Sequence, residues 1–140
     1  MKNLYSPSML KSYLSCKYII FNEVNEKKLN LKKIELSKND KLRLEKGNIH
    51  EKNYLKQLKK KYKKVIDIKN SDLSKEEKIS KTIQAMKEGW EVIHGGYLKR
   101  DKWRGEFDFL IINKNLKSKF GDYSYEVIDT KNSNKPKPDH

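Results

Sequence analysis

The order of the expected elements predicts an α/β fold in which helices flank a central mixed sheet. Two long stretches in the first half carry apolar residues at helical spacing, and short runs rich in Val and Ile come later. One further helical stretch separates the first of these runs from the others, which favours a mixed sheet. At 140 residues the chain is long enough for one domain with a real core, and we expect residues 1–140 to form that single domain.

Two helical segments are expected in the first half of the chain. A Ser cap and a Pro in the first turn, Ser6 and Pro7, predict a helix over about 6–24. Residues 25–36 form a connection rich in Lys and Asn. A long helix is then expected over about 39–62, from its apolar positions three and four residues apart.

The second half carries shorter elements. A Ser-rich start and a terminal Gly89 predict a helix over about 71–88. The other expected elements are a strand at 65–68, hairpin strands at 90–98 and 103–112 around a turn at 99–102, a polar turn at 113–122, a last strand at 123–131 and a tail at 132–140 without regular pattern.

Charge and cysteine content limit the class of protein. The net charge of +14 favours polyanionic partners, although the excess consists almost entirely of Lys and supports nucleic-acid binding only weakly. The single cysteine, Cys16, excludes an internal disulfide and a four-cysteine metal site. No apolar run approaches the roughly 20 residues that span a bilayer, and no signal-peptide pattern opens the chain. We therefore expect a cytoplasmic protein without a membrane partner.

Two acids and a lysine stand out in the last strands. Asp108 is the lone acid in an otherwise apolar strand, where a charge is costly unless it is paired or binds metal. Asp129 and Lys131 are two residues apart, so on a strand they point the same way. Carboxylates that hold a hard cation, next to a lysine that orients water, suit divalent-metal chemistry on phosphate. The plainer interpretation is that both acids are satisfied by backbone or Lys and that Lys131 is solvated.

The long helix adds a second group of candidates. Glu51 lies in the middle of a largely apolar stripe, with His50 and Tyr54 on its flank. Gly47, one turn earlier, predicts that another element approaches the helix closely there. A His and a Glu at a seam between helix and sheet could reach a metal held by the sheet, although a lone helical His is usually structural and Glu51 could equally be an internal salt-bridge partner. The stripe contains Leu44, Asn48, Glu51, Leu55, Leu58 and Tyr62.

These segments together resemble the PD-(D/E)XK nuclease superfamily, and in particular its RecB-like branch. The resemblance rests on their order along the chain and covers most of residues 6–131. The matching segments are Ser6-Pro7-Ser8 with the helix that follows, Gly47-Asn48-Ile49-His50, Gly105-Glu106-Phe107-Asp108 and Asp129-Thr130-Lys131. The resemblance implies a restriction-endonuclease-like fold, with a central mixed sheet flanked by helices.

The resemblance also assigns roles to individual residues. His50, Asp108 and Asp129 would be ligands of Mg²⁺ or Mn²⁺, with the backbone carbonyl of Thr130 as a further ligand. Lys131 would be the catalytic lysine, acting together with the two aspartates. The side chains expected to support this site are Glu51, Glu106 and Tyr54.

Two features depart from the family pattern. Phe107 replaces the proline that gives the superfamily its name, and neither glutamine of the chain, Gln57 or Gln84, has a Tyr four residues later. The branch usually carries such a Gln-x-x-x-Tyr helix after the lysine, so we expect a C-terminally truncated domain. Iron–sulfur members of the branch have one cysteine near the N-terminus, so Cys16 could be an iron–sulfur ligand in a longer protein. Within this chain the simpler expectation is a buried apolar Cys16.

The expected function is metal-dependent hydrolysis of DNA phosphodiester bonds, in DNA repair, recombination or defence. Arg100 and Arg104 on the expected hairpin are candidates for contacts with the DNA backbone. A helicase domain or subunit is the partner that the resemblance implies besides DNA. A second hypothesis is a catalytically inactive nucleic-acid-binding module derived from the same fold. His94 and the terminal His140 are expected to be incidental.

Overall fold

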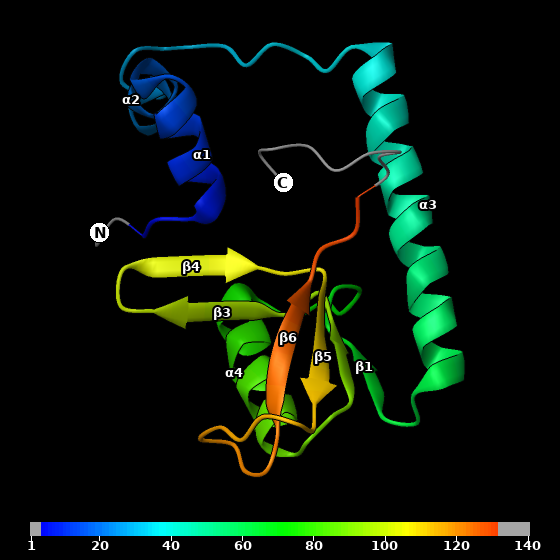
Figure 1. Cartoon of the computed structure of the whole chain (residues 1–140). Coiled ribbons are helices and arrows are strands. Elements are labelled where there is room, and N and C mark those ends of the chain that lie inside the picture. The colour runs from blue at the N-terminus through cyan, green and yellow to red at the C-terminus, as the bar shows by residue number, and fades with distance from the viewer. Residues whose placement is uncertain (1–3, 132–140) are drawn as a thin grey trace.

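A computed structural model describes residues 4–131 of the chain (Figure 1). These residues form four helices, a mixed four-stranded sheet and a separate two-stranded sheet, so the predicted α/β class is confirmed. The expected tail, 132–140, and His140 lie outside the described residues. The elements are α1 (Pro7–Ser15), α2 (Lys17–Asn25), α3 (Lys38–Lys61), β1 (Val65–Asp67), α4 (Lys75–Lys87), β2 (Val92–His94), β3 (Tyr97–Arg100), β4 (Trp103–Glu106), β5 (Phe109–Asn113) and β6 (Ser124–Ile128).

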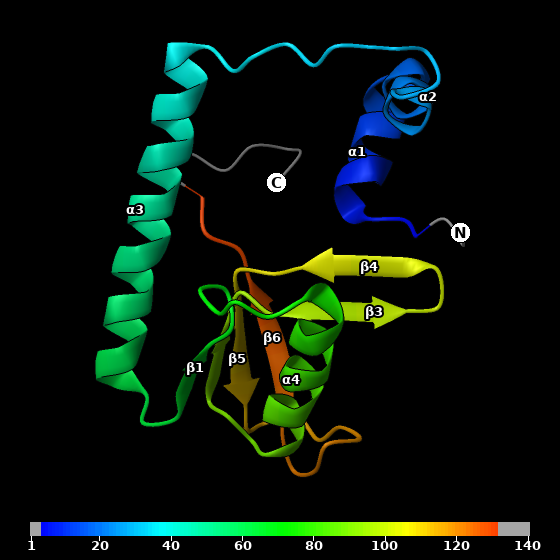
Figure 2. The same ribbon diagram turned by 180° about the vertical axis from the view of Figure 1, so that it is seen from behind.

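The larger sheet has the strand order β1-β2-β5-β6. β1 runs parallel to β2, while β5 is antiparallel to both β2 and β6. Helix α4 passes behind this sheet in Figure 1 and in front of it in Figure 2, and α3 stands on the other side. β3 and β4 form the separate two-stranded sheet, a hairpin that reaches away from the larger sheet, and Trp103 of β4 also forms an isolated bridge with Tyr5.

Two apolar clusters fill the two faces of the larger sheet. Neighbouring residues on a strand point to opposite faces, so Ile93 packs with the α4 side whereas Val92 packs with the α3 side. The α4 cluster contains Ile68, Ala85, Met86, Ile93 and Leu110. The α3 cluster contains Leu55, Leu58, Val92 and Phe109.

Local side-chain chemistry explains where the two longer helices begin. Ser37 caps α3 by accepting a hydrogen bond from the backbone N–H of Asp40 at 3.1 Å. Ser74 caps α4 through a capping box, in which the Glu77 carboxylate accepts from the Ser74 backbone N–H at 2.8 Å. Gly89 follows the end of α4 with φ +67°, a conformation that favours glycine. Both predicted helices are confirmed to within a few residues.

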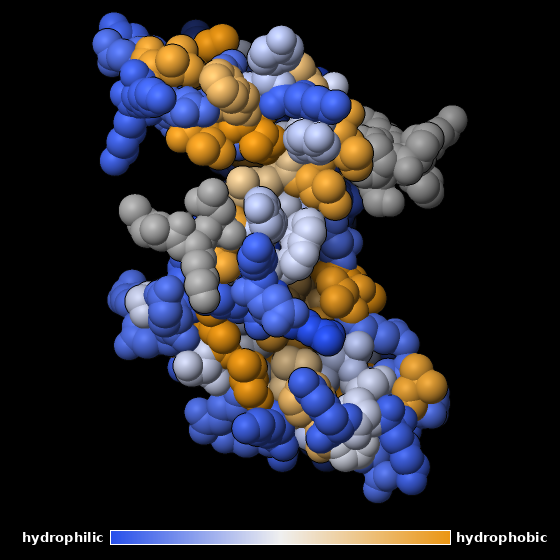
Figure 3. Space-filling model, turned by 90° about the vertical axis from the view of Figure 1, so that its left-hand side faces the viewer, coloured by the Kyte–Doolittle hydropathy of each residue, from blue (hydrophilic) through white to orange (hydrophobic). Residues whose placement is uncertain are grey.

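The N-terminal segment differs from its prediction. The expected single helix is divided into α1 and α2, because Cys16 adopts an extended backbone with φ −161° and ψ 117°. Cys16 is also exposed, so the expectation of a buried cysteine was wrong. Many apolar side chains of this helical pair lie in contact with solvent, including Leu14 and Tyr18, which are 76% and 75% exposed. In Figure 3, hydrophobic residues accordingly gather in the upper part of the molecule.

The single long hairpin expected over 90–112 is divided into two separate strand pairs, which we call its two levels. β2 pairs with β5, β3 pairs with β4, and short links at residues 95–96 and 107–108 connect the levels. Gly95 has φ +62° and its backbone N–H donates to the Asp108 carbonyl at 2.8 Å. A Cβ at Gly96 would lie 2.3 Å from the Phe107 ring, so the close approach of the two links requires glycine.

The apolar stripe of α3 is buried only in its C-terminal half. Glu51, Leu55 and Leu58 are buried, but Leu44 is 58% exposed. A Cβ added at Gly47 would meet no atom within 4 Å, so the expected close approach of another element there is not seen. The N-terminal half of α3 extends beyond the sheet (Figure 1).

Among residues 4–131, no helix combines the length and the apolar character that crossing a bilayer requires.

Candidate active site

Polar residues at or next to the ends of the four strands of the larger sheet lie at one edge of that sheet. β1 and β2 end at Asp67 and His94, which are partners in the parallel pairing. His94 lies opposite Phe109, the first residue of β5, and Phe109 lies opposite Ile128, the last residue of β6. Residues that end β1 and β2, precede β5 or follow β6 therefore meet at the same edge.

Asp108 and Asp129 flank the paired ends of β5 and β6. The expected last strand ends at Ile128, so Asp129, Thr130 and Lys131 follow it as extended chain outside the ladder. Asp108 accepts hydrogen bonds from both the backbone N–H and the hydroxyl of Thr130, each at 2.8 Å. Thr130 thus joins the start of β5 to the segment that carries the other two candidates.

Opposing effects act on the half-buried carboxyl of Asp108. Burial alone would raise its pKa, but the two hydrogen bonds from Thr130, an interaction with the Asp129 side chain and the positive charge of Lys69 outweigh burial, so the pKa is lowered. The carboxylate form of Asp108 is therefore favoured. The charged form of a carboxyl is also the form that binding of a cation requires.

Lys131 is bound to Asp129 by an ion pair of 2.7 Å between Nζ and Oδ2. The hydrogen bond to Asp129 raises the pKa of Lys131, burial opposes this, and the charges of Asp129 and Asp108 add to the increase. Both partners are about half exposed, so the pair is accessible to a ligand. The structure therefore brings Asp108, Asp129 and Lys131 together, although Asp108 precedes β5 and the other two follow β6, so none lies within the strands expected to carry them.

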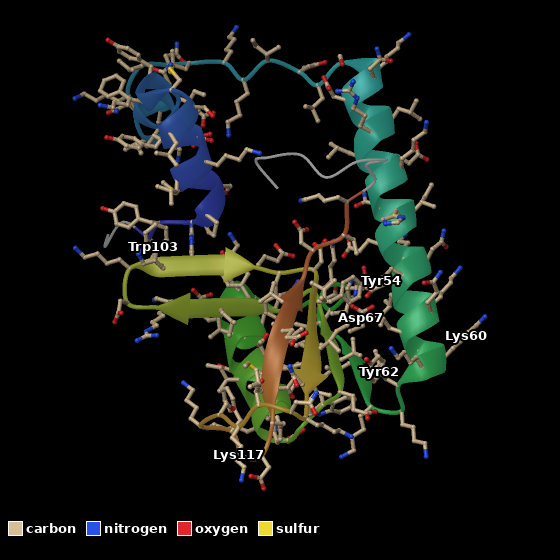
Figure 4. The ribbon with its side chains drawn as sticks, viewed as in Figure 1. Tyr54, Lys60, Tyr62, Asp67, Trp103 and Lys117 are labelled. Atoms are coloured by element: carbon tan, nitrogen blue, oxygen red, sulfur yellow. The ribbon has the colours of Figure 1, made fainter. Side chains whose placement is uncertain are left out.

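A second, more buried polar network lies beside this group. Glu51, which is 7% exposed, reaches in from α3. Its carboxylate accepts two hydrogen bonds from Lys69 Nζ at 2.7 and 2.6 Å, and it lies 2.7 Å from Nε2 of His94. Nδ1 of His94 lies 2.8 Å from Asp67 Oδ1. The result is a chain Lys69–Glu51–His94–Asp67, and the labelled Asp67 lies between the sheet and α3 in Figure 4.

His94 is the centre of that chain. It is 2% exposed and stacks on Phe109 with ring centroids 4.8 Å apart. Each of its ring nitrogens faces a carboxylate oxygen, and a carboxylate only accepts, so both contacts are hydrogen bonds when both nitrogens carry a proton. The expectation that His94 is incidental was wrong, because the fold buries it between two acids.

Lys69 connects the two groups. Its ammonium is held by Glu51, and its charge also acts on Asp108. The side chain is about one third exposed, so Lys69 lies between the buried network and the more open Asp108–Asp129–Lys131 group. Asp108 therefore interacts electrostatically with two lysines, Lys69 and Lys131.

The remaining predicted site residues are placed differently. His50 is exposed on α3, and the structure does not bring it to Asp108. At this position of the helix its neighbour Glu51 is the buried residue. Tyr54 is half-buried and packs edge-on against Phe109 at 5.2 Å. Glu106 is exposed at the end of β4.

Sequence reasoning missed Asp67, Lys69 and His94. One signal was present, because Asp67-Ile68-Lys69 has the same spacing as Asp129-Thr130-Lys131 and also follows a short apolar strand. In a chain with thirty lysines the pattern is common, so only the shared sheet edge distinguishes these two copies.

The donor set fits a hard divalent cation of the Mg²⁺ type. Across the described part of the chain, no three His, Cys, Asp or Glu side chains are grouped so that they could hold a metal ion. Mg²⁺, however, is usually bound by one or two carboxylates and keeps several waters or phosphate oxygens. Asp108 and Asp129 meet that requirement, and His50 does not contribute to it.

Comparison of the chain with protein-family models, with curated proteins and with solved structures finds no match.

Proposed function

We propose that the protein is a metal-dependent nuclease that hydrolyses phosphodiester bonds of DNA. The observation that carries this proposal is the meeting of Asp108, Asp129 and Lys131 at one edge of the sheet, with Thr130 as the link. The fold we propose is restriction-endonuclease-like, and the mixed sheet with a helix on each face is compatible with it.

Asp108 and Asp129 would hold the cation, Mg²⁺ or Mn²⁺. When bound, such a cation lowers the pKa of a coordinated water and neutralises charge on the phosphate. Lys131 has three N–H donors on a half-exposed side chain, so its ammonium can orient the attacking water or a phosphate oxygen next to the carboxylates. Thr130 keeps Asp108 ionised and aligned by donating two hydrogen bonds to it.

The buried network would support the site from below. Glu51 neutralises Lys69 and holds its ammonium in place, and Lys69 in turn lowers the pKa of Asp108. His94 and Asp67 fix the carboxylate of Glu51 from the other side. The network contributes positioning and charge balance, while contact with substrate belongs to the more exposed group.

A role in DNA repair, recombination or defence, with a helicase domain or subunit as partner, is the biological setting we propose for this activity. The second candidate is an inactive nucleic-acid-binding module. Its support is that the described side chains supply only two carboxylates, without a third ligand such as His50. The net charge of +14 fits both candidates.

Cleavage of a fluorescent DNA strand in Mg²⁺ or Mn²⁺ tests the proposal. Asp108→Asn and Asp129→Asn remove one charge each while keeping the shape of the side chain, and Lys131→Met removes the ammonium. Each variant is expected to lower the cleavage rate by about 100-fold or more, because general acid–base and charge-stabilising groups contribute about 10²–10⁴ each. DNA binding in EDTA should remain, because it depends on many dispersed lysines.

Asp122→Asn and Lys117→Met are matched controls, because these residues form an exposed ion pair of 2.9 Å in the loop before β6. Both control proteins should cleave at the wild-type rate. Calorimetric titration with Mn²⁺ separates the two candidate functions. A wild-type chain that binds DNA, takes up no Mn²⁺ and cleaves nothing would refute the nuclease and favour the binding module.

A further inference from the structure

A large cavity lies away from the carboxylate edge, between the β3–β4 hairpin, α4 and the loop that precedes β6. Its volume is about 1230 Å³. Pro7 at the start of α1 borders it from the hairpin side, since the backbone around Tyr5 pairs with β4. The lining residues are Pro7, Ile83, Met86, Lys87, Leu98, Lys99, Arg100, Trp103, Arg104, Gly105, Lys119 and Phe120.

The charge of this lining has one sign. Five of the twelve residues are Lys or Arg, and among the described residues that line the cavity none is Asp or Glu. The nearest acid in the turn, Asp101, lies 3.9 Å from Arg100, and both side chains are almost fully exposed, so this contact neutralises little. A lining with five cations and no acid favours an anionic ligand.

The rest of the lining is apolar and partly aromatic. Trp103 is 47% exposed, and the centroid of its ring lies 5.8 Å from that of Tyr5. Lys119 lies over the Phe120 ring, 5.3 Å from its centroid. In Figure 3, hydrophobic and hydrophilic residues lie side by side in the lower half of the molecule, on the face that contains the end of the hairpin. Aromatic surface next to cations is the combination that binds bases and phosphates of single strands.

Size and position favour a polymer over a small molecule. The cavity exceeds the roughly 300–1,000 Å³ that is typical of small-ligand pockets. Arg104 precedes Asp108 by four residues, so their Cα atoms are at most about 14 Å apart, or about four nucleotides at 3.4 Å each. One strand could therefore occupy the cavity and still reach the carboxylate edge.

We propose that this cavity binds a single-stranded segment of nucleic acid, with bases against Trp103 and Phe120 and phosphates at Arg104 and Lys119. The inference rests on the proposed function for the identity of the polymer, and it adds that the substrate is held as a single strand next to the cleavage site. Duplex DNA fits less well, because its bases are stacked inside and cannot reach the two rings.

Fluorescence anisotropy of the full chain in EDTA tests this, with a fluorescein-labelled (dT)20 strand and a duplex of the same length as probes. The variant Arg104→Gln/Lys119→Gln is compared with Lys56→Gln/Lys60→Gln, which removes the same charge from the exposed face of α3. The cavity variant should bind the strand about tenfold more weakly, with a salt slope lower by about 1.4 for two lost phosphates. The control should change affinity about twofold.

Substitution of Trp103 tests stacking separately. Trp103→Leu should weaken binding of the strand about fivefold or more, since stacking on an aromatic ring contributes about 1–3 kcal/mol per base, whereas Trp103→Phe should keep most of the affinity. Circular dichroism of each variant verifies that the fold is retained. A Trp103→Leu protein that folds and binds normally overturns the stacking.

Other outcomes would overturn the proposal as a whole. One is equal affinity of the wild type for the single strand and the duplex. Another is an equal loss of strand affinity in the cavity variant and in the Lys56/Lys60 control. The third is a wild type that binds anionic phospholipid vesicles but not the single strand. Because EDTA prevents metal-dependent cleavage, a failure of the nuclease proposal leaves this measurement unchanged. Conversely, loss of strand binding in the cavity variant but not in the control would support the cavity proposal, and cleavage at Asp108 and Asp129 would still be decided by the separate cleavage assay.

Discussion

Substitution of Glu51 by Gln is the most direct test of the buried network. The carboxylate of Glu51 receives three contacts, two from Lys69 and one from His94, all at 2.6–2.7 Å. Gln keeps the shape but removes the charge, and it places an N–H donor where an ammonium or imidazole donor already points. The Lys69 ammonium and the buried His94 ring then lose the carboxylate that they share, in a site that is largely out of water.

The expected loss of unfolding free energy is about 2–4 kcal/mol. Removing one partner of a fully buried ion pair costs about 3–5 kcal/mol. The lower range applies because the side chain of Lys69 is 35% exposed and can turn toward water. His94 has no such escape, since it is 2% exposed. With a urea dependence of about 2 kcal/mol per molar, the middle of the usual range, the unfolding midpoint should fall by about 1–2 M.

Urea unfolding followed by tryptophan fluorescence measures this change. Glu45→Gln is the control, because Glu45 is an exposed acid on the same helix, and its effect should stay within about 0.5 kcal/mol. A Glu51→Gln protein with the stability of this control would show that the contacts of Glu51 with Lys69 and His94 do not stabilise the fold, and the network would have to be abandoned.

Two further predictions concern the same edge of the sheet. Gly95→Ala should lower the free energy of unfolding, measured in urea, by at least about 2 kcal/mol, because Ala would adopt a positive φ and its Cβ would lie only 2.1 Å from that of Lys69. Gly47→Ala is the control and should be neutral or stabilising, because a Cβ there meets no atom within 4 Å. Equal effects of the two substitutions would contradict the assigned packing. Hydrogen bonds from Asn70 and His94 outweigh burial, which acts in the opposite direction, and lower the pKa of Asp67. The stability that the ionised Asp67 provides is present above the unfolded pKa of about 3.9 and is lost as the pH falls through the lower folded pKa. The melting temperatures of the wild type and of Asp67→Asn should therefore converge below pH ~4. A difference that stays constant with pH would refute this role of Asp67.

The helices that could be predicted are those whose signals are local. Ser37 and Ser74 cap α3 and α4 with their own side chains, and Gly89 ends α4 through its backbone, so the sequence alone contains the cause. The break at Cys16 has no such local cause, since neither Gly nor Pro marks it. Its extended backbone became visible only in the structure.

The candidate site shows the same division. Asp108 and the Asp129–Lys131 pair stood out because an acid in an apolar strand is rare and alternation fixes a spacing of two. His94 and Lys69 could not be identified, because their roles arise from Glu51, which is more than fifteen residues away from either along the chain. The direction of α3 decided between His50 and Glu51, and that direction depends on packing against β2 and β5.

Two short links connect the larger sheet to the β3–β4 hairpin, and they are bonded to each other. The chain leaves β2 through Gly95 and Gly96 and returns to β5 through Phe107 and Asp108, and the links are bonded to each other by Gly95 N–H to the Asp108 carbonyl and by Phe107 N–H to the Gly96 carbonyl at 3.3 Å. Asp108 is therefore part of the connection that fixes the base of the hairpin, and its carbonyl is one of the two acceptors there. The contacts that hold the hairpin in place thus also fix the backbone of the residue proposed to hold the cation.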